Sequence, residues 1–175
     1  MKFSDIEPFT NDGRYQVNQL WSSLPEWFDR DWELSGPPDL DPDFQRGHVW
    51  DENKQRAFVE FSLRGGKGSN IIRFNCTGWM QDFRGPFVLV DGKQRLESVR
   101  QFMADELTVF DGMCCSDFED ELKWAAGPDF IFNINDLKTR ADVLRWYLEI
   151  NSGGIVHTAD ELEKVRALLE EESDE

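Results

Sequence analysis

The first part of the chain carries apolar residues in two groups that predict helices, with a loop between them. Residues 14–34 place apolar side chains at helical spacing, and Pro25 favours the start of a new turn within this stretch. Residues 35–42 are rich in proline and predict a loop. Asp51 is a suitable N-cap for a helix that continues to about Leu63. The side chains expected to face inward from that helix are those of Ala57, Phe58 and Phe61.

The middle of the chain predicts two strands and a helix. Residues 71–74 and 87–90 are short, largely apolar runs bounded by turn residues, which is typical of buried strands. A loop or hairpin is expected over residues 75–86. After the second strand, Asp91 and Gly92 predict a turn that leads into a helix. The inward face of that helix is predicted to carry Leu96, Val99, Phe102 and Met103.

The last third predicts one more strand between helices. Residues 118–124 predict a helix, and residues 130–132 predict a strand. Thr139 can cap a further helix, which the Asn-Ser-Gly-Gly run at residues 151–154 ends. Residues 158–161 have the spacing of a capping box that opens a final helix. The apolar side chains of these two helices are those of Val143, Leu144, Trp146, Tyr147, Leu162, Val165, Leu168 and Leu169.

This succession of elements predicts a compact α+β (mixed α/β) fold with a small mixed sheet and surrounding helices. We expect a helical extension over residues 1–40, one globular domain over residues 41–169 and an acidic tail over residues 170–175. The sequence has no apolar run of membrane-spanning length and no apolar leader at its start. We therefore expect a cytoplasmic protein with no membrane partner.

Cysteine and histidine usage favours neither disulfides nor a zinc site. Cys76, Cys114 and Cys115 are odd in number and include an adjacent pair, so they suggest no disulfide framework. We interpret all three as reduced packing residues, since the two histidines are isolated and offer no zinc-ligand spacing. His48 remains a secondary candidate for acid–base chemistry because it lies close to Arg46 in sequence.

Charge is distributed unevenly along this acidic chain. The net charge is −16, made up of −7 over residues 1–43, +4 over residues 44–100 and −13 over residues 101–175. The overall negative charge argues against direct nucleic-acid binding, because it repels the phosphates of a nucleic acid. The basic central segment instead predicts a pocket for a small anion.

The basic segment contains the most informative motif, Asp91-Gly92-Lys93-Gln94-Arg95, at the junction of a predicted strand and a predicted helix. A helix start has unpaired backbone N–H groups and the positive end of the helix dipole, which together attract anions. Lys93 and Arg95 add fixed positive charge. A nucleotide is therefore the first ligand to consider.

A second glycine- and lysine-containing segment, residues 64–69, is interpreted differently. It lacks the spacing of a P-loop and follows a predicted helix, so we expect a helix C-terminus and a flexible loop. Among the seven tryptophans, Trp50 and Trp79 are the ones to test as base-stacking residues, because both lie near candidate binding loops in sequence.

Three features in this order resemble the N-terminal domain of GmrSD-type restriction proteins, whose signature is an Asp-Gly-Gln-Gln-Arg run. They are Phe44-Gln45-Arg46-Gly47 before a helix, a glycine-rich turn before a strand, and the Asp-Gly-Lys-Gln-Arg run. The similarity covers about residues 40–107 and returns at residues 151–154. It implies a ParB/sulfiredoxin-like fold that binds a nucleoside triphosphate, which several relatives hydrolyse with a divalent metal.

The resemblance also implies roles for individual residues. Gln45 and Arg46 would reach the phosphates from the first loop, and Gly92 would let the backbone approach them. Gln94 and Arg95 would contact the phosphates from the helix start. These two and Asp91 form the expected catalytic set, with Asp91 orienting a water or holding one bound to Mg²⁺. The binding set adds Lys93, which replaces the glutamine of the signature and strengthens phosphate attraction.

Three functions remain open from the sequence. The first is a Mg²⁺-dependent nucleoside triphosphatase, and the second is a nucleotide sensor without turnover that regulates a defence or restriction partner, such as a separately encoded nuclease. The third is an acidic DNA mimic that inhibits a DNA-binding protein. The chain lacks the reactive cysteine of sulfiredoxin within this turn, and two scattered histidines cannot form an HNH-like nuclease site.

Overall fold

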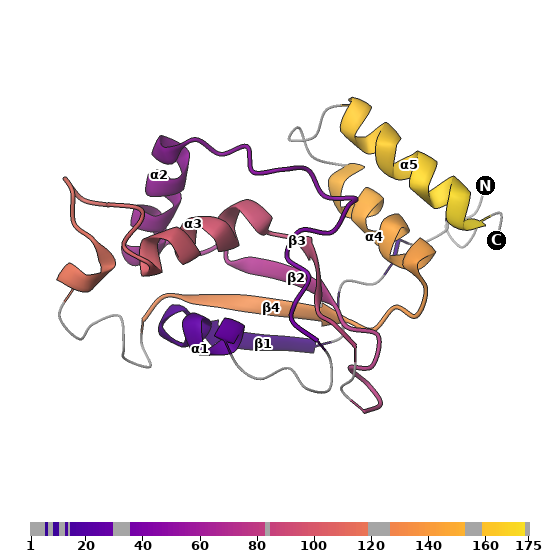
Figure 1. Cartoon of the computed structure of the whole chain (residues 1–175), viewed down its shortest axis with the longest axis horizontal. Coiled ribbons are helices and arrows are strands. Elements are labelled where there is room, and N and C mark those ends of the chain that lie inside the picture. The colour runs from indigo at the N-terminus through magenta and orange to yellow at the C-terminus, as the bar shows by residue number, and fades with distance from the viewer. Residues whose placement is uncertain are drawn as a thin grey trace.

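The protein has an α+β fold, as predicted. A computed structural model describes residues 6, 9–10, 13, 15–29, 36–82, 85–118, 127–152 and 159–173. Its four-stranded mixed sheet has the order β1-β4-β2-β3 (Figure 1). The strands are β1 (Tyr15–Leu20), β2 (Ile71–Asn75), β3 (Val88–Asp91) and β4 (Asp129–Asn135). The β2 and β4 pair is parallel, and the β1–β4 and β2–β3 pairs are antiparallel.

Side chains along a strand alternate between the two faces of the sheet, and the apolar side chains of β2 and β4 pack into the main core. Ile72 and Phe74 of β2 and Phe132 of β4 are at most 2% exposed and belong to one hydrophobic cluster. Arg73 lies between the first two and therefore faces the opposite side of the sheet. This cluster also receives side chains from α1 (Leu24–Asp29), α2 (Glu52–Leu63) and α3 (Lys93–Met103).

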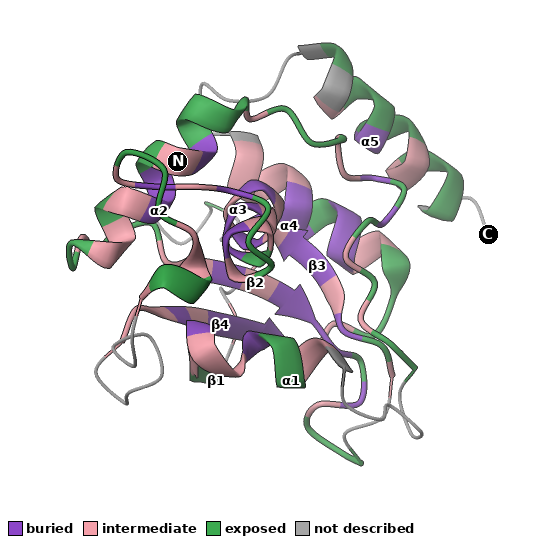
Figure 2. Cartoon of the chain, turned by 60° about the vertical axis from the view of Figure 1, so that its left-hand side comes forward, coloured by how far each residue is buried: buried purple, intermediate pink, exposed green. Residues whose placement is uncertain are grey.

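A second hydrophobic cluster lies at the β3 end of the sheet. It joins Val90 of β3 and Phe44 to the helices α4 (Arg140–Ser152) and α5 (Ala159–Ser173). Figure 1 shows these two helices paired beyond the β3 end, while α2 and α3 lie beside one another. Most described residues of α5 are exposed, while Val165 is buried in this cluster and Leu168 and Leu169 pack against it partly buried (Figure 2).

The helix expected over residues 14–34 is wrong at its start. Tyr15–Leu20 form β1, which pairs with β4 along its whole length, and helical structure begins only with a 3₁₀ turn (η2, Trp21–Ser23) followed by α1. The apolar positions fitted a helix because Trp21 and Leu24, which are both 1% exposed, belong to η2 and α1 and not to the strand. Pairing with a distant strand thus overrides the local spacing.

The remaining elements follow the predictions with shifted boundaries. Asp51 caps α2, accepting a hydrogen bond from the Lys54 N–H at 2.8 Å, and Phe58 is buried as expected. Ala57 and Phe61, however, are exposed, because the buried face of α2 carries Gln55, Phe58 and Val59 instead. Gln55 lies about one turn before Phe58 and Val59, so the three side chains share one face.

In the last third of the chain, two predictions fall mostly or partly outside the described residues, and a third, the acidic tail, needs adjustment. The helix expected over residues 118–124 lies almost entirely outside them, and so does Thr158 of the expected capping box, together with His157. The acidic residues 170–172, expected in a frayed tail, continue α5, which extends to Ser173. Within the described part of the chain, no helix combines the length and the apolar character needed to cross a bilayer.

Candidate functional site

The candidate site is built on the turn between β3 and α3. Gly92 is the N-cap of α3 and has a φ of 102°, a conformation that strongly favours glycine. A Cβ at this position would lie 2.6 Å from Cδ1 of Ile72, so glycine also permits the close packing of the helix start on β2. The first N–H groups of α3 have no intrahelical acceptors and lie at the positive end of the helix dipole.

A cavity of about 450 Å³ adjoins this turn, and we call it the cationic cavity. Five of its lining side chains are cationic, while Asp91 is the one carboxylate among its described lining residues. The cations come from a loop, from α2, from β2 and from the start of α3: Arg46, Lys54, Arg73, Lys93 and Arg95. The other lining residues are Gln45, Trp50, Val90, Gly92, Gln94, Tyr147, Ile150 and Asn151.

Asp91 orients two of the arginines. Its Oδ2 accepts hydrogen bonds from Nη1 of Arg73 at 2.9 Å and from Nη2 of Arg95 at 3.0 Å. The three side chains are 21% to 27% exposed, so these ion pairs are partly shielded from solvent. The carboxylate therefore fixes two guanidinium groups beside each other while neutralising only part of their charge.

The guanidinium of Arg95 has a further unsatisfied donor. Its Nε is buried and has no hydrogen-bond partner among the described residues. Buried donors are nearly always paired with a protein group, a water or a ligand. Since Arg95 lines the cationic cavity, an acceptor that enters the cavity could pair with this N–H.

The two predicted glutamines both bind backbone groups. Nε2 of Gln45 donates to the carbonyl of Leu89 at 2.6 Å. Oε1 of Gln94 accepts from the N–H groups of Val49 and Trp50 at 2.9 and 3.1 Å. Nε2 of Gln94 also donates to the carbonyl of Gly47 at 3.2 Å. These amides attach the loop of residues 44–50 to the β3–α3 turn.

Lys93 makes a similar connection. Its Nζ forms an ion pair with Asp41 and donates to the backbone carbonyl of Arg46 at 3.3 Å. The Lys93 side chain is 16% exposed, and Asp41 is largely solvent-exposed. Lys93 therefore serves both as a lining cation and as a contact to the loop that carries Arg46.

All seven predicted site residues thus line one cavity, although their roles as ligands or catalytic groups stay predictions. Sequence reasoning missed Arg73 and Lys54. Arg73 had a signal, namely a charged residue in an otherwise apolar strand, whose position opposite the core side chains directs it away from the core. Lys54 had no such signal, because a lysine on an exposed helix face is common.

Sequence reasoning also missed Tyr147 and Ile150 in the uncharged wall of the cavity, whereas Trp50 was a named candidate and Asn151 belongs to the 151–154 run of the resemblance. Tyr147, Ile150 and Asn151 lie on one face of α4 at spacings of three and four residues. Tyr147 is buried and its ring packs against that of Phe44 at a centroid distance of 5.2 Å. Trp50, from the loop of residues 44–50, also lines the cavity, and Nζ of Lys54 lies 5.0 Å from the centroid of its ring.

Other candidates do not contribute to this cavity. His48 is exposed and hydrogen-bonds Gln55, and it does not line the cationic cavity. Trp79 instead packs on Phe87 with a ring-centroid distance of 5.6 Å. Burial raises the pKa of the Cys76 thiol, which keeps it protonated at neutral pH. In the part of the chain that the structure describes, no three His, Cys, Asp or Glu residues form a metal-binding group.

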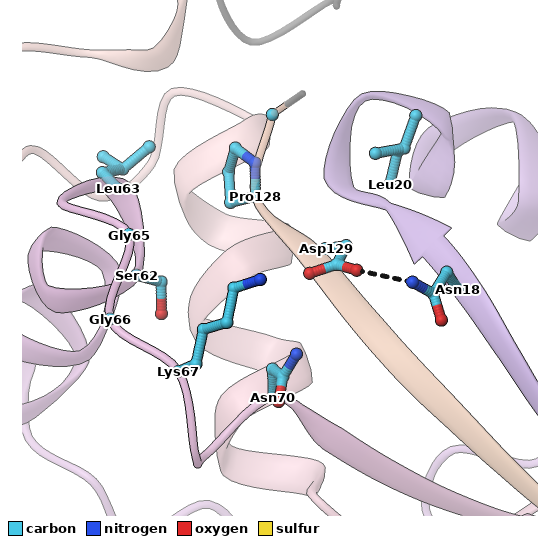
Figure 3. A pocket seen from close by; sticks show the side chains of 11 residues that line it. Asn18, Leu20, Ser62, Leu63, Gly65, Gly66, Lys67, Asn70, Pro128 and Asp129 are labelled. Carbon is cyan, nitrogen blue, oxygen red and sulfur yellow. Dashed lines mark hydrogen bonds between the residues drawn. The ribbon is translucent and has the colours of Figure 1, made fainter. Parts of the chain in front are cut away.

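The Gly-rich turn of residues 64–69 adjoins a different cavity, of about 480 Å³, which we call the second cavity (Figure 3). The turn ends α2, with the N–H groups of Arg64, Gly65 and Gly66 bonded to carbonyls of the last helical turn. The prediction of a helix C-terminus is therefore confirmed. Lys67 is the one lining cation described here, and Asp129 accepts a hydrogen bond from Asn18 at 3.0 Å.

Comparison of the chain with protein-family models, with curated proteins and with solved structures finds no match.

Proposed function

We propose that the cationic cavity binds a nucleoside triphosphate and that the protein hydrolyses it with the help of Mg²⁺. The observation that carries this proposal is the convergence of five cationic side chains and a helix start on one cavity that has a single described carboxylate. Asp41 pairs with Lys93 from outside the cavity and Asp91 is shared between two arginines, so an anion or solvent is expected to help balance the positive charge. An oligophosphate supplies several negative charges and many acceptor oxygens.

The uncharged wall favours a nucleotide over inorganic phosphate. Tyr147, Ile150 and Asn151 provide apolar surface and a polar group, and Trp50 provides an aromatic ring. Aromatic and apolar side chains accommodate the flat faces of nucleobases. A ligand with a charged tail and a planar, weakly polar end therefore complements both kinds of wall.

Asp91 fits the expected role in holding Mg²⁺ through water. Mg²⁺ in phosphate sites commonly uses one or two carboxylates, phosphate oxygens and several waters. Both ion pairs described for Asp91 use its Oδ2. Bound Mg²⁺ would neutralise phosphate charge, while Arg73 and Arg95 would orient the phosphates and stabilise charge that develops during transfer.

The resemblance to GmrSD-type restriction proteins supports the same activity and suggests a partner. On this proposal the chain acts in restriction or phage defence, together with a separately encoded nuclease or defence subunit. Its fold would be ParB/sulfiredoxin-like.

A matched pair of arginine variants tests the proposal. Arg95→Ala removes a lining guanidinium, whereas Arg100→Ala removes an exposed one from the same helix that does not line the cationic cavity. Melting curves with ATP, GTP, CTP and UTP, each with and without Mg²⁺, should show stabilisation of the wild type and of Arg100→Ala by at least one nucleotide. Phosphate release should require Mg²⁺ and be lost in Arg95→Ala. Absence of nucleotide stabilisation in the wild type would contradict the proposal.

A nucleotide sensor without turnover is the second candidate, and one observation favours it. The amides of Gln45 and Gln94 are engaged with backbone groups, so neither is an obvious positioner of an attacking water. Stabilisation by a nucleotide with no release of phosphate, under conditions where Mg²⁺ is present, would select the sensor over the enzyme.

A further inference from the structure

The loop of residues 44–50 carries three lining residues of the cationic cavity, Gln45, Arg46 and Trp50, but has no helix or strand of its own. A loop of this kind loses conformational entropy when it presents a side chain at a fixed position. Contacts from neighbouring elements must therefore restrain it before Arg46 can act as a preformed ligand.

Gln94 supplies most of the side-chain hydrogen bonds that reach the second half of this loop. Its three bonds go to the backbone of Gly47, Val49 and Trp50, and the residue is only 9% exposed. Val49 is itself 53% exposed, so its side chain contributes little to fixing the loop. The second half of the loop is therefore held through its backbone by one amide from α3, while Lys93 and Gln45 restrain the first half.

Most hydrogen-bonding groups of the Gln94 amide are used within the protein, so few remain for a ligand. A glutamine side chain has two acceptor sites on its oxygen and two N–H donors. Both acceptor sites of Gln94 are used by Val49 and Trp50, and one donor is used by Gly47. A single N–H remains, which is less than the neighbouring arginine guanidinium offers.

We propose that Gln94 is a positioning residue, which locks the loop of residues 44–50 onto the first turn of α3 and so places Arg46 and Trp50 for the nucleotide. This inference rests on the proposed function. Consecutive residues of α3 then have different tasks: Arg95 contacts the ligand, and Gln94 fixes a loop that lines the same cavity.

Three variants separate this role from direct phosphate contact. Gln94→Met keeps the length of the side chain and removes its hydrogen bonds, and Gln101→Met makes the same change on α3 away from the cationic cavity. Val49→Pro removes one N–H that Gln94 accepts and leaves α3 untouched. Each variant is checked for folding by its melting temperature, and amide hydrogen exchange reports on the loop.

In hydrogen exchange, Gln94→Met should lose protection at the amides of Val49 and Trp50, and Gln101→Met should not. Binding of the best-stabilising nucleotide, measured by calorimetry, should weaken about tenfold or more in Gln94→Met, because all three hydrogen bonds from Gln94 to the loop backbone are lost. Val49→Pro should weaken binding by about threefold or more, with one such bond removed. Gln101→Met should bind like the wild type.

A double-mutant cycle with Arg46→Ala gives the decisive comparison. If Gln94 acts through the loop, Arg46→Ala should weaken binding much less in the Gln94→Met background than in the wild type, because Arg46 is already misplaced there. Additive effects of the two substitutions, or unchanged loop exchange in Gln94→Met, would overturn the inference while leaving the proposed function intact. If the wild type binds none of the four nucleotides, the proposed function fails and this inference fails with it.

Discussion

Two turns of this protein combine glycine with lysine beside cavities of similar size. The Gly-rich turn of residues 64–69 adjoins a cavity of about 480 Å³, and the DGKQR turn of residues 91–95 adjoins one of about 450 Å³. Both contain glycines with positive φ, at 81° for Gly65 and 102° for Gly92. Composition alone does not distinguish them.

The two turns differ in which end of a helix they adjoin. The Gly-rich turn follows the C-terminal end of α2, where backbone carbonyls and the negative end of the dipole are found, whereas the DGKQR turn precedes α3. One lysine lines the second cavity among the described residues, and five cations line the cationic cavity. Helix polarity and converging charge, more than glycine content, thus mark a candidate anion site.

The largest expected effect contrasts a cation from each cavity. Arg73→Met should weaken nucleotide binding by about 30-fold to 100-fold, because charged hydrogen bonds contribute roughly 2–3 kcal/mol each. Lys67→Met should leave binding unchanged. Calorimetric titration of both variants measures this difference, and equal losses in the two variants would remove the functional distinction between the turns.

The next prediction compares the two glycines, and the expected difference between the two variants is smaller. Gly92→Ala combines positive φ with a Cβ 2.6 Å from Cδ1 of Ile72, and we expect a loss of about 3 kcal/mol in the free energy of unfolding. Gly65→Ala also has positive φ but meets nothing within 4 Å, so about 1–2 kcal/mol is expected. Urea denaturation of both variants provides the comparison. A greater loss for Gly65→Ala would show that the helix start tolerates a side chain.

The smallest effect concerns α4, which forms a wall of the cationic cavity and does not line the second cavity. The Thr139 hydroxyl donates to Asp142 at 2.7 Å and holds the pKa of this carboxyl below its usual value of 3.8. A lowered pKa means that the ionised carboxylate stabilises the fold above about pH 4, and that this contribution is lost as pH falls through the folded-state pKa.

Thr139→Val should therefore lower the free energy of unfolding by about 1 kcal/mol at pH 7, as for a lost helix cap, and by less near pH 3. Thr77→Val, at an exposed site outside any helix or strand, serves as the control. Melting temperatures at pH 3, 5 and 7 measure the trend. A loss that stays constant with pH would mean that the Thr139–Asp142 contact does not depend on ionisation.

Local sequence signals predicted the DGKQR turn and the start of α3 more successfully than the first strand. The turn, the helix start and the neighbouring charges are all encoded within residues 91–95, so short-range rules apply. In contrast, Tyr15–Leu20 form a strand only because β4, more than a hundred residues later in sequence, pairs with them. Helical spacing of apolar residues could not reveal that pairing.

Local sequence signals also do not reveal which distant residues join the cavity. Arg73 and Asp91 meet because β2 and β3 pair in a specific register, which places these two residues opposite each other. Asn151 reaches the cavity because α4 packs on β3 through the cluster that contains Val90. The glutamines were correctly placed at the cavity, but their bonds to loop backbone depend on a tertiary arrangement that a motif does not encode.

The cavity is assembled from segments that are made at different times. The DGKQR turn and its loop leave the ribosome well before α4, which packs through Tyr147 against Phe44 and closes one side. A nascent chain that has reached only α3 lacks the lining residues Tyr147, Ile150 and Asn151. On the proposed function, synthesis of α4 would therefore be the step that completes the nucleotide site.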